Sequence, residues 1–342
     1  MNVVNGEQKN ALLYDNNMET YIPKIYVDSE DHSSTVDAIR KACIESEFFY
    51  VAGHGIETSD VFEQMKAFFD LPLDEKTLVV DSTRTHGYTA LREETLDPSN
   101  RTTGDTKEGF YISMKDVSVD DPLYNPEKFA GPNEWPDSLK CPSMKDPEAF
   151  KITMKTYMNK AMFLALTVIR LIAESLGLPP NYFDASLVNE PLALLRLLHY
   201  DAVRSDVESG VYACGAHSDY GMVTILLTDE SDGLQIYDKR GCQEWVPIPT
   251  VPGCFIVNIG DMLEQWSNGM YCSTLHRVIN TSGSERYSAP FFVDPSYDTV
   301  VECLDVCCNE ESPPLYAPTT SGVYILSKYQ YTRADFAPSL TE

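Results

Sequence analysis

The 342-residue sequence predicts one mainly β domain, a β-sandwich or barrel buttressed by helices. Two observations lead to this fold class. Between residues 192 and 294, short runs rich in β-branched and aromatic residues alternate with Asp-Gly, Arg-Gly and Asn-Gly turns, which is typical of about seven or eight strands in an all-β core. Apolar residues make up 43% of the chain and are spread along most of it, so a large core is expected and wholesale disorder is excluded.

The N-terminal part is expected to form a helix, a strand and a second helix. Residues 1–20 are polar and are treated as a loose segment. The Ser-Ser-Thr sequence at 33–35 can cap a helix over about 34–46, in which apolar residues recur at helical spacing. The aromatic run 48–51 predicts a buried strand, and the apolar spacing within 61–69 indicates an amphipathic helix.

A long irregular segment and two further helices are expected next and near the C-terminus. Residues 81–146 are rich in Asp, Thr, Asn, Gly and Pro without a sustained period, and long irregular segments of this kind are often binding loops or lids. We therefore expect this segment to cover a site. Helical spacing over 147–176, ended by Gly and two Pro, predicts a long core helix, and a final helix is expected over about 319–333.

The domain organisation follows from these elements. The sequence contains no internal repeat, low-complexity tract or linker, so one domain is expected over residues 21–335. This domain divides into a helical and loop region, a β core that carries the candidate site, and a C-terminal helix region (21–180, 181–300 and 301–335). The loose segment 1–20 precedes it and a short tail, 336–342, follows.

Charge and cysteine content narrow the classes of function. With 52 Asp and Glu against 26 Lys and Arg, the net charge of −26 would repel nucleic acids and anionic membrane surfaces. The nine cysteines include no CxxC motif, and the N-terminus lacks the pattern of a secretory signal, so a cytoplasmic protein with reduced thiols is expected. The longest apolar run, 161–173, is too short for a membrane span. We expect a small-molecule substrate, with no nucleic acid, membrane or obligatory protein partner.

Two histidines of the β region, His217 and His276, are candidate metal ligands. His217 and Asp219 are two residues apart, so an extended chain directs both side chains to one face, where they can bind one metal. His276 lies on a later expected strand and is the third candidate ligand. Two neutral imidazoles and one carboxylate leave adjacent positions of an octahedron open, as a non-haem Fe(II) oxygenase requires. The alternative is two buried, hydrogen-bonded histidines, because an HxD motif with a distant His often occurs by chance.

Arg286 and Ser288 give a second signal, on the strand expected after His276. Period-two spacing directs both side chains to one face, where a guanidinium and a hydroxyl can bind a carboxylate through charge-assisted hydrogen bonds. A buried Arg otherwise requires an acidic partner. The distal carboxylate of 2-oxoglutarate is a candidate for that partner, while its 2-oxo acid end would chelate iron.

Taken together, these motifs resemble the catalytic core of the isopenicillin N synthase-like Fe(II)/2-oxoglutarate-dependent oxygenases. The similarity runs from GAHSDYG at 215–221 to PFFVDP at 290–295, and it continues in SEFFYVAGHGI (46–56) and in GYTALREETLDPSNRTTGDTKEGFYIS (87–113). It therefore covers roughly residues 20–335. The resemblance implies a double-stranded β-helix, or jelly roll.

The resemblance also implies roles for individual residues. His217, Asp219 and His276 would be the iron ligands, and Arg286 with Ser288 would hold 2-oxoglutarate. Tyr200 matches a tyrosine with which the family helps to hold the cosubstrate near the metal. Asp201 departs from the family, which usually has Pro there, and this leaves the geometry after Tyr200 open.

The implied enzyme uses Fe(II), 2-oxoglutarate and O₂, with ascorbate as a candidate reductant. It would oxidise an unactivated C–H bond by hydroxylation, desaturation or ring closure, and would release succinate and CO₂. Arg84 and Tyr88 resemble the Arg and Tyr with which isopenicillin N synthase holds the carboxylate of its substrate. We therefore expect a carboxylate-bearing, amino-acid-derived metabolite, with Lys107 and Phe110 as further candidate contacts; the alternative for Arg84 is a solvated surface residue.

Three other functions stay open. An Fe(II) oxidase of the same fold, of the isopenicillin N synthase or aminocyclopropane-carboxylate oxidase type, would not use 2-oxoglutarate and would release no succinate. A zinc hydrolase could use the same ligands, but no general base is near the motif in sequence and the Arg-x-Ser pair would have no role. A non-catalytic binding protein is disfavoured because all three candidate ligands are intact.

Overall fold

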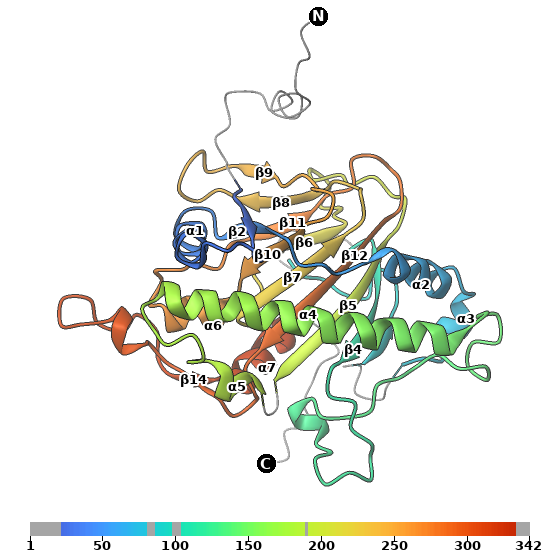
Figure 1. Ribbon diagram of the computed structural model, residues 1–342. Coiled ribbons are helices and arrows are strands. Elements are labelled where there is room, and N and C mark those ends of the chain that lie inside the picture. The colour runs from blue at the N-terminus through green and yellow to red at the C-terminus, as the bar shows by residue number, and fades with distance from the viewer. Residues whose placement is uncertain (1–21, 81–85, 98–103, 189–190, 333–342) are drawn as a thin grey trace, which may run out of the picture.

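The computed structural model describes residues 22–80, 86–97, 104–188 and 191–332. Its centre is an eight-stranded sheet with the order β1-β2-β10-β7-β12-β5-β4-β3 (Figure 1). These strands are β1 (Lys24–Tyr26), β2 (Phe48–Ala52), β3 (Gly87–Thr89), β4 (Lys107–Ser113), β5 (Leu192–Tyr200), β7 (Val223–Thr228), β10 (Phe255–Ile259) and β12 (Arg286–Asp294). A smaller sheet has the order β6-β11-β8-β9. Its strands are β6 (Cys214–His217), β8 (Leu234–Tyr237), β9 (Trp245–Pro247) and β11 (His276–Val278), and β13 (Val300–Val301) pairs with β14 (Thr319–Thr320).

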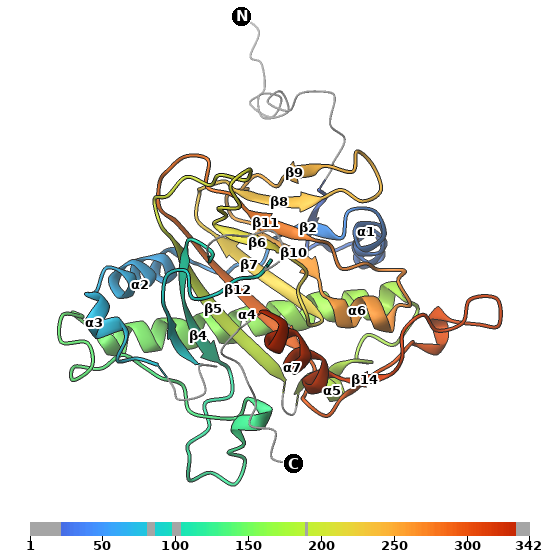
Figure 2. The ribbon, with the colours of Figure 1, turned by 180° about the vertical axis from the view of Figure 1, so that it is seen from behind.

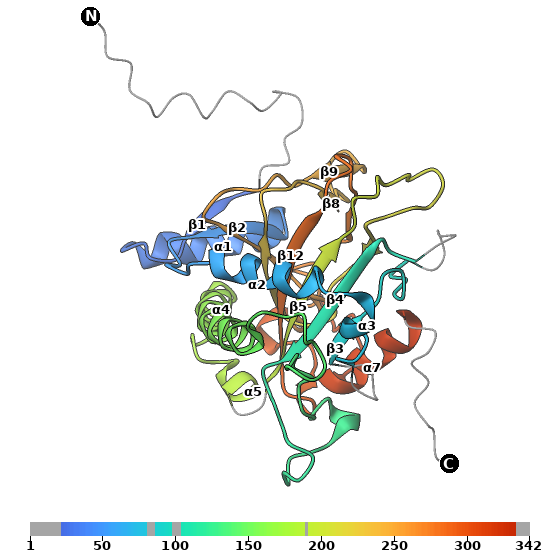
Figure 3. The same ribbon diagram turned by 90° about the vertical axis from the view of Figure 1, so that its right-hand side faces the viewer.

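Helices cover the large sheet. The helices are α1 (His32–Glu45), α2 (Ser59–Phe69), α3 (Leu73–Lys76), α4 (Pro147–Ser175), α5 (Asp184–Val188), α6 (Asp261–Trp266) and α7 (Ser321–Thr332), with 3₁₀ turns at Pro126–Lys128 and Asp305–Cys307. The long helix α4 crosses one face of the large sheet, with α1 and α2 packed beside it, whereas α7 lies on the opposite face (Figures 1 and 2). Viewed from the side, α4 is seen nearly end-on beside the sheet (Figure 3).

Two apolar clusters result from this layering. One lies between the large sheet and helices α1, α2 and α4, and the other joins the two sheets. Strand β12 shows how period two separates them, because Tyr287 and Phe291 belong to the cluster under the helices whereas Arg286 and Ser288 point to the other side. The space between the sheets is therefore the place where polar side chains of the large sheet meet those of the small one.

The predicted helices and strands are confirmed with one exception. The helices expected near 34–46, 61–69, 147–176 and 319–333 are present, and β5 to β12 occupy the predicted β region. The prediction of an irregular segment over 81–146 was wrong in part, because it contains β3 and the seven-residue strand β4. Six of the seven β4 residues are buried, so this strand lacks the alternation that marks a half-exposed strand.

Helix α4 is long and apolar enough to cross a membrane by length and composition alone. Its N-terminus is capped by Asp146, whose carboxylate accepts a hydrogen bond from the Ala149 N–H at 2.9 Å, and Pro147 follows at the first position of the helix. Within its most apolar window, 61% of the residues are buried inside the molecule, as in the core helix of a globular protein.

Candidate functional site

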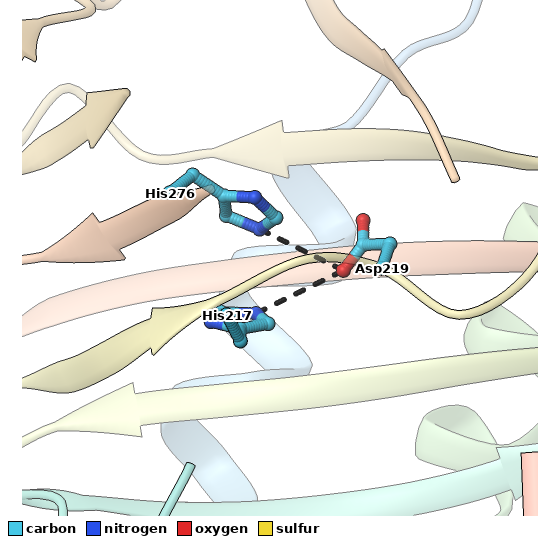
Figure 4. A group of neighbouring side chains, drawn as sticks. All are labelled: His217, Asp219 and His276. Carbon is cyan, nitrogen blue, oxygen red and sulfur yellow. Dashed lines mark ion pairs between the residues drawn. The ribbon is translucent and has the colours of Figure 1, made fainter. Parts of the chain in front are cut away.

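Three potential metal ligands converge where β6 and β11 pair. His217 ends β6, Asp219 follows it in the next turn, and His276 begins β11. The two strands run antiparallel with His217 directly opposite His276, so strand register alone brings the imidazoles together. The ligand atoms of the three residues lie within 4.8 Å of one another (Figure 4).

The orientation of each imidazole is set by a backbone carbonyl. The Nδ1 of His217 lies 2.9 Å from the Gly215 carbonyl, and the Nδ1 of His276 lies 3.1 Å from that of Thr274. A carbonyl oxygen can only accept, so each Nδ1 is the donor and each Nε2 keeps its lone pair. Both Nε2 atoms face Oδ1 of Asp219, at 3.8 Å from His217 and 3.6 Å from His276 (Figure 4).

The carboxylate of Asp219 is held by two donors from the large sheet. The Thr224 hydroxyl and the Asn258 side-chain amide each donate to Oδ2 at 2.6 Å. These bonds occupy one carboxylate oxygen and leave Oδ1 directed at the two histidines. Support of this kind from residues behind the ligands is typical of metal sites.

The protonation states of His217 and Asp219 suit a divalent metal. Burial, together with the neighbouring His276, lowers the pKa of His217 to about 3, so this imidazole is neutral near pH 7. Burial raises the pKa of Asp219, but the two imidazoles and the hydrogen bonds from Asn258 and Thr224 outweigh it and hold the pKa below its ordinary value. Neutral imidazole and ionised carboxylate are the forms that bind metal ions.

A buried cavity, here called the inner cavity, extends from the three ligands between the two sheets. Arg286, Ser288 and Tyr200 line it together with the ligands. The guanidinium carbon of Arg286 lies 4.8 Å from the centre of the Tyr200 ring, and Ser288 donates to the Tyr200 hydroxyl at 3.3 Å.

Arg286 is only 3% exposed and pairs with no carboxylate in the described part of the chain. Its Nε donates to the Ser231 carbonyl at 3.4 Å, whereas Nη1 is buried without any acceptor among the described residues. A buried guanidinium without a counter-ion is costly. The inner cavity therefore suits a small molecule that ends in a carboxylate and reaches the metal ligands with its other end.

A second cavity, here called the outer cavity, lies on the other side of the ligands. Its apolar lining includes Leu96, Tyr111, Phe129, Leu192, Leu194, Tyr220, Phe292, Ile325 and Tyr329, and its charged lining includes Glu94, Lys115, Arg196 and Asp294. Residues Ile325 and Tyr329 come from α7, which lies over this face of the large sheet (Figure 2). His217, Asp219, Arg196 and Phe292 line both cavities, so two of the three candidate ligands lie where the cavities meet.

Three of the residues predicted to contact substrate, Tyr88, Lys107 and Phe110, are not brought to this cavity. Tyr88 donates to Glu108, and Phe110 is fully buried in the cluster under the helices. Lys107 is buried in ion pairs with Asp105 and Glu94, and it lines neither cavity. Alternation along β4 explains the first two placements, because Glu108 and Phe110 face the helices. Arg84 lies outside the described residues.

Sequence reasoning missed several residues that the structure places at the site. Arg196 and Asp294 line the outer cavity, while Thr224 and Asn258 support Asp219. Period-two spacing could have indicated two of them, because Arg196 shares a strand face with Tyr200 and Asp294 shares one with Arg286.

Comparison with known proteins gives matches over most of the chain. Residues 191–295 match the model of the 2OG-Fe(II) oxygenase superfamily, and residues 22–138 match that of the N-terminal region of non-haem dioxygenases in morphine synthesis. Kihadalactone A synthase of Citrus sinensis is 37% identical, with 89% of this chain and 90% of the relative covered. A 2-oxoglutarate-Fe(II) type oxidoreductase of Emericella nidulans is 34% identical, with 92% and 90% covered. Homoarginine-6-hydroxylase of Glycine max is 36% identical, with 81% and 85% covered.

The solved structures are consistent with these matches. A full-length Neurospora crassa protein, crystallised with alpha-KG and 5-formyluracil, superposes with a TM-score of 0.76 at 29% identity, covering 91% of this chain and 96% of that one. A putative 2OG-Fe(II) oxygenase family protein from Caulobacter crescentus superposes with a TM-score of 0.76 at 26% identity, covering 91% and 98%. These superpositions confirm the jelly roll with flanking helices predicted from sequence.

Proposed function

Because the chain belongs to the 2OG-Fe(II) oxygenase superfamily, we propose that this Fe(II)- and 2-oxoglutarate-dependent dioxygenase oxidises an unactivated C–H bond of a small, carboxylate-bearing, amino-acid-derived metabolite. One observation carries the assignment of the site. A preformed group of two imidazoles and one carboxylate shares a buried cavity with an arginine that has no counter-ion among the described residues.

The roles of the residues follow from this cavity. His217, Asp219 and His276 would hold Fe(II), and Arg286, Ser288 and Tyr200 would hold the distal carboxylate of 2-oxoglutarate. When bound, iron, 2-oxoglutarate and O₂ supply the oxidising power, and one oxygen atom leaves in succinate while CO₂ is released. The protein's own contribution is to orient the ligands and the cosubstrate and to keep water out of an apolar cavity.

The alternative of an Fe(II) oxidase without 2-oxoglutarate is less well supported. In such an enzyme no cosubstrate would reach the buried Nη1 of Arg286, so the carboxylate of the substrate itself would have to enter the inner cavity to supply the missing acceptor. A carboxylate cosubstrate removes this requirement, because it supplies both the negative charge and the missing acceptor.

The substrate class is supported by the charges of the outer cavity. Lys115 and Arg196 are cationic side chains at its lining, and the Nε of Arg196 is buried without an acceptor among the described residues. A substrate carboxylate could provide that acceptor. The name of the soybean relative, a homoarginine hydroxylase, agrees with an amino-acid-derived substrate. Arg84 stays a proposed contact.

Anaerobic spectroscopy tests the proposal. Fe(II) is added to the metal-free protein, then 2-oxoglutarate is titrated while the weak visible charge-transfer band of a chelated 2-oxo acid is recorded. We expect the band in the wild-type protein, and a loss of 2-oxoglutarate affinity of at least about tenfold in Arg286→Ala, because a charged hydrogen-bond partner is removed. Arg170→Ala, at an exposed ion pair with Asp184, is the matched control and should titrate like the wild type. Iron binding without the band would instead support the oxidase.

A further inference from the structure

We propose that the outer cavity recognises a cationic nitrogen of the substrate, a protonated amine or guanidinium, and that Asp294 is the side chain that binds it. The inference rests on the proposed function, because the outer cavity is the substrate site only if the neighbouring ligands hold the iron. It adds a second recognition group to the carboxylate, and so specifies a zwitterionic substrate.

The position of Asp294 follows from the alternation of β12. Arg286, Ser288, Phe292 and Asp294 share one face of this strand. The first two line the inner cavity, Phe292 lines both cavities, and Asp294 lines the outer one. One face of β12 thus carries Arg286, which would bind the cosubstrate, at one end and the carboxylate of Asp294 at the other. His217 and Asp219 lie where the two cavities meet.

Within the described part of the chain, the carboxylate of Asp294 accepts one hydrogen bond, from the Met222 N–H to Oδ1 at 3.2 Å. It lies directly over Gly221, where a Cβ would be 1.3 Å from Oδ1, so the neighbouring turn leaves room for the carboxylate only because residue 221 has no side chain. Gly221 lines the outer cavity as well, which places the carboxylate at the cavity wall.

No Lys, Arg or His of the described ranges forms an ion pair with Asp294. Glu94, which also lines the outer cavity, differs from Asp294 in this respect. Its carboxylate pairs with Arg196 at 2.5 Å and with Lys107 at 3.0 Å. Lys328, whose ammonium lies 5.6 Å from the centre of the Tyr220 ring, is paired with Asp261 at 2.9 Å. Asp294 is thus the acid of the outer cavity that still needs a positive partner.

The electrostatic cost of this arrangement supports the same conclusion. Burial, with added repulsion from Asp219, raises the pKa of Asp294 to about 7. The ionised carboxylate is therefore poorly compensated by the protein itself. A cation in the cavity would compensate it, because an opposite charge within contact distance favours the ionised form.

Aromatic side chains complete a site for a cation. Phe129, Tyr220, Phe292 and Tyr329 line the same cavity as Asp294. The faces of aromatic rings attract ammonium and guanidinium groups, with a contribution of about 0.5–2 kcal/mol each. Arg196 also lines this cavity, and its Nε has no acceptor among the described residues although its Nη2 pairs with Glu94, so a substrate with both charges would find a partner for each.

The test uses full-length protein loaded with Fe(II) and 2-oxoglutarate without oxygen. Three ω-amino acids of increasing length (4-aminobutanoate, 6-aminohexanoate and 8-aminooctanoate) are titrated, each beside the acid that lacks the amine and the hydroxy acid of equal length. Perturbation of the charge-transfer band reports binding. We expect at least one amino acid to bind about tenfold or more tightly than both of its analogues.

Variants assign the effect to Asp294. Asp294→Asn keeps the size of the side chain and an acceptor for the Met222 N–H, and it should abolish the preference for the amine while leaving the affinity for the plain acid unchanged. Asp298→Asn, at an exposed carboxylate, is the matched control and should keep the preference. The inference is overturned if no amine outbinds its analogues, if a hydroxy acid binds equally well, or if Asp294→Asn retains the preference. If no 2-oxoglutarate band forms at all, the proposed function itself fails and this inference falls with it.

Discussion

Asn258 and Thr224 determine which oxygen of Asp219 faces the two histidines. Both donate to Oδ2 at 2.6 Å, and neither is itself a candidate metal ligand. A carboxylate held in this way can bind a metal through Oδ1 without first reorienting. The affinity for iron is therefore expected to depend on residues that do not coordinate it.

Replacing Asn258 by Ala should weaken Fe(II) binding by about 10–100-fold, because Asp219 loses one of its two supporting donors. Anaerobic titration of the metal-free protein with Fe(II) measures this affinity directly. Asn181→Ala, at an exposed position, is the control and should bind Fe(II) like the wild type. Unchanged affinity in Asn258→Ala would show that the carboxylate is held by the rest of the site.

Replacing Asp219 by Ala should abolish both Fe(II) binding and the formation of succinate from 2-oxoglutarate. The change removes the one anionic ligand and leaves two imidazoles, which carry no negative charge to offset that of a divalent ion. Asp120→Ala at an exposed position should retain both properties. Succinate formation retained in Asp219→Ala would contradict the assigned ligand set.

At the scale of elements, a buried ionic network connects β4 to the strand that ends in His217. Lys107 lies between Asp105 and Glu94, and Asp105 accepts a hydrogen bond from the Gly215 N–H of β6 at 2.9 Å. The Gly215 carbonyl in turn accepts the bond from His217. The packing of β4 thus contributes to the position of His217, a candidate metal ligand.

Replacing Lys107 by Met should lower the free energy of unfolding by about 3–5 kcal/mol, because it leaves buried carboxylates with less positive charge. Urea unfolding measures the change. Lys155→Met removes a lysine whose side chain is 46% exposed in its pair with Asp116, and it should cost about 0–1 kcal/mol. Equal losses in the two variants would indicate that the network contributes no more than a surface pair.

The same elements show what the sequence could and could not predict. Helices α1, α2 and α4 were predictable because their apolar residues recur at helical spacing, although α1 is capped by Asp31, which accepts from the Ser34 N–H at 3.1 Å, rather than by the Ser-Ser-Thr run. Strand β4 was missed because it is buried on both faces. The local sequence pattern is enough to predict an amphipathic helix. A strand that is buried on both faces can be identified only once the sheet has packed.

The site divides in the same way. His217 and Asp219 could be paired from sequence because their spacing of two fixes a common direction on an extended chain. The contacts of Asn258 and Thr224 with Asp219 could not be predicted from sequence, because they depend on the pairing of β10 with β7, whose residues are distant in sequence. Arg196 and Asp294 come to line the outer cavity only once the strands have packed together.

In the whole molecule, the apolar core under the helices and the candidate site lie on opposite faces of the large sheet. The helices α1, α2 and α4 bury an apolar cluster on one face, and this face contains none of the candidate ligands. The other face meets the small sheet and α7, and every polar group of the site opens toward it. The apolar packing and the candidate site are therefore largely separated, and Asp294 is an exception because it lines the outer cavity and its carboxyl is expected to affect unfolding.

Asp294 should make the free energy of unfolding of the metal-free protein depend on pH. Burial raises its pKa to about 7 in the folded state, against about 3.9 in an unfolded chain. The folded state thus holds this proton more tightly, so the stability that it contributes is full below about pH 4 and is lost as the pH rises through about 7. At 1.36 kcal/mol per pH unit, the wild type should lose roughly 2–3 kcal/mol relative to Asp294→Asn between pH 5 and pH 8.

Urea unfolding of both proteins at the two pH values measures the difference, with Asp298→Asn as the exposed control that should follow the wild type. Parallel stability curves for the wild type and Asp294→Asn would show that the folded protein does not hold this carboxyl in its protonated form.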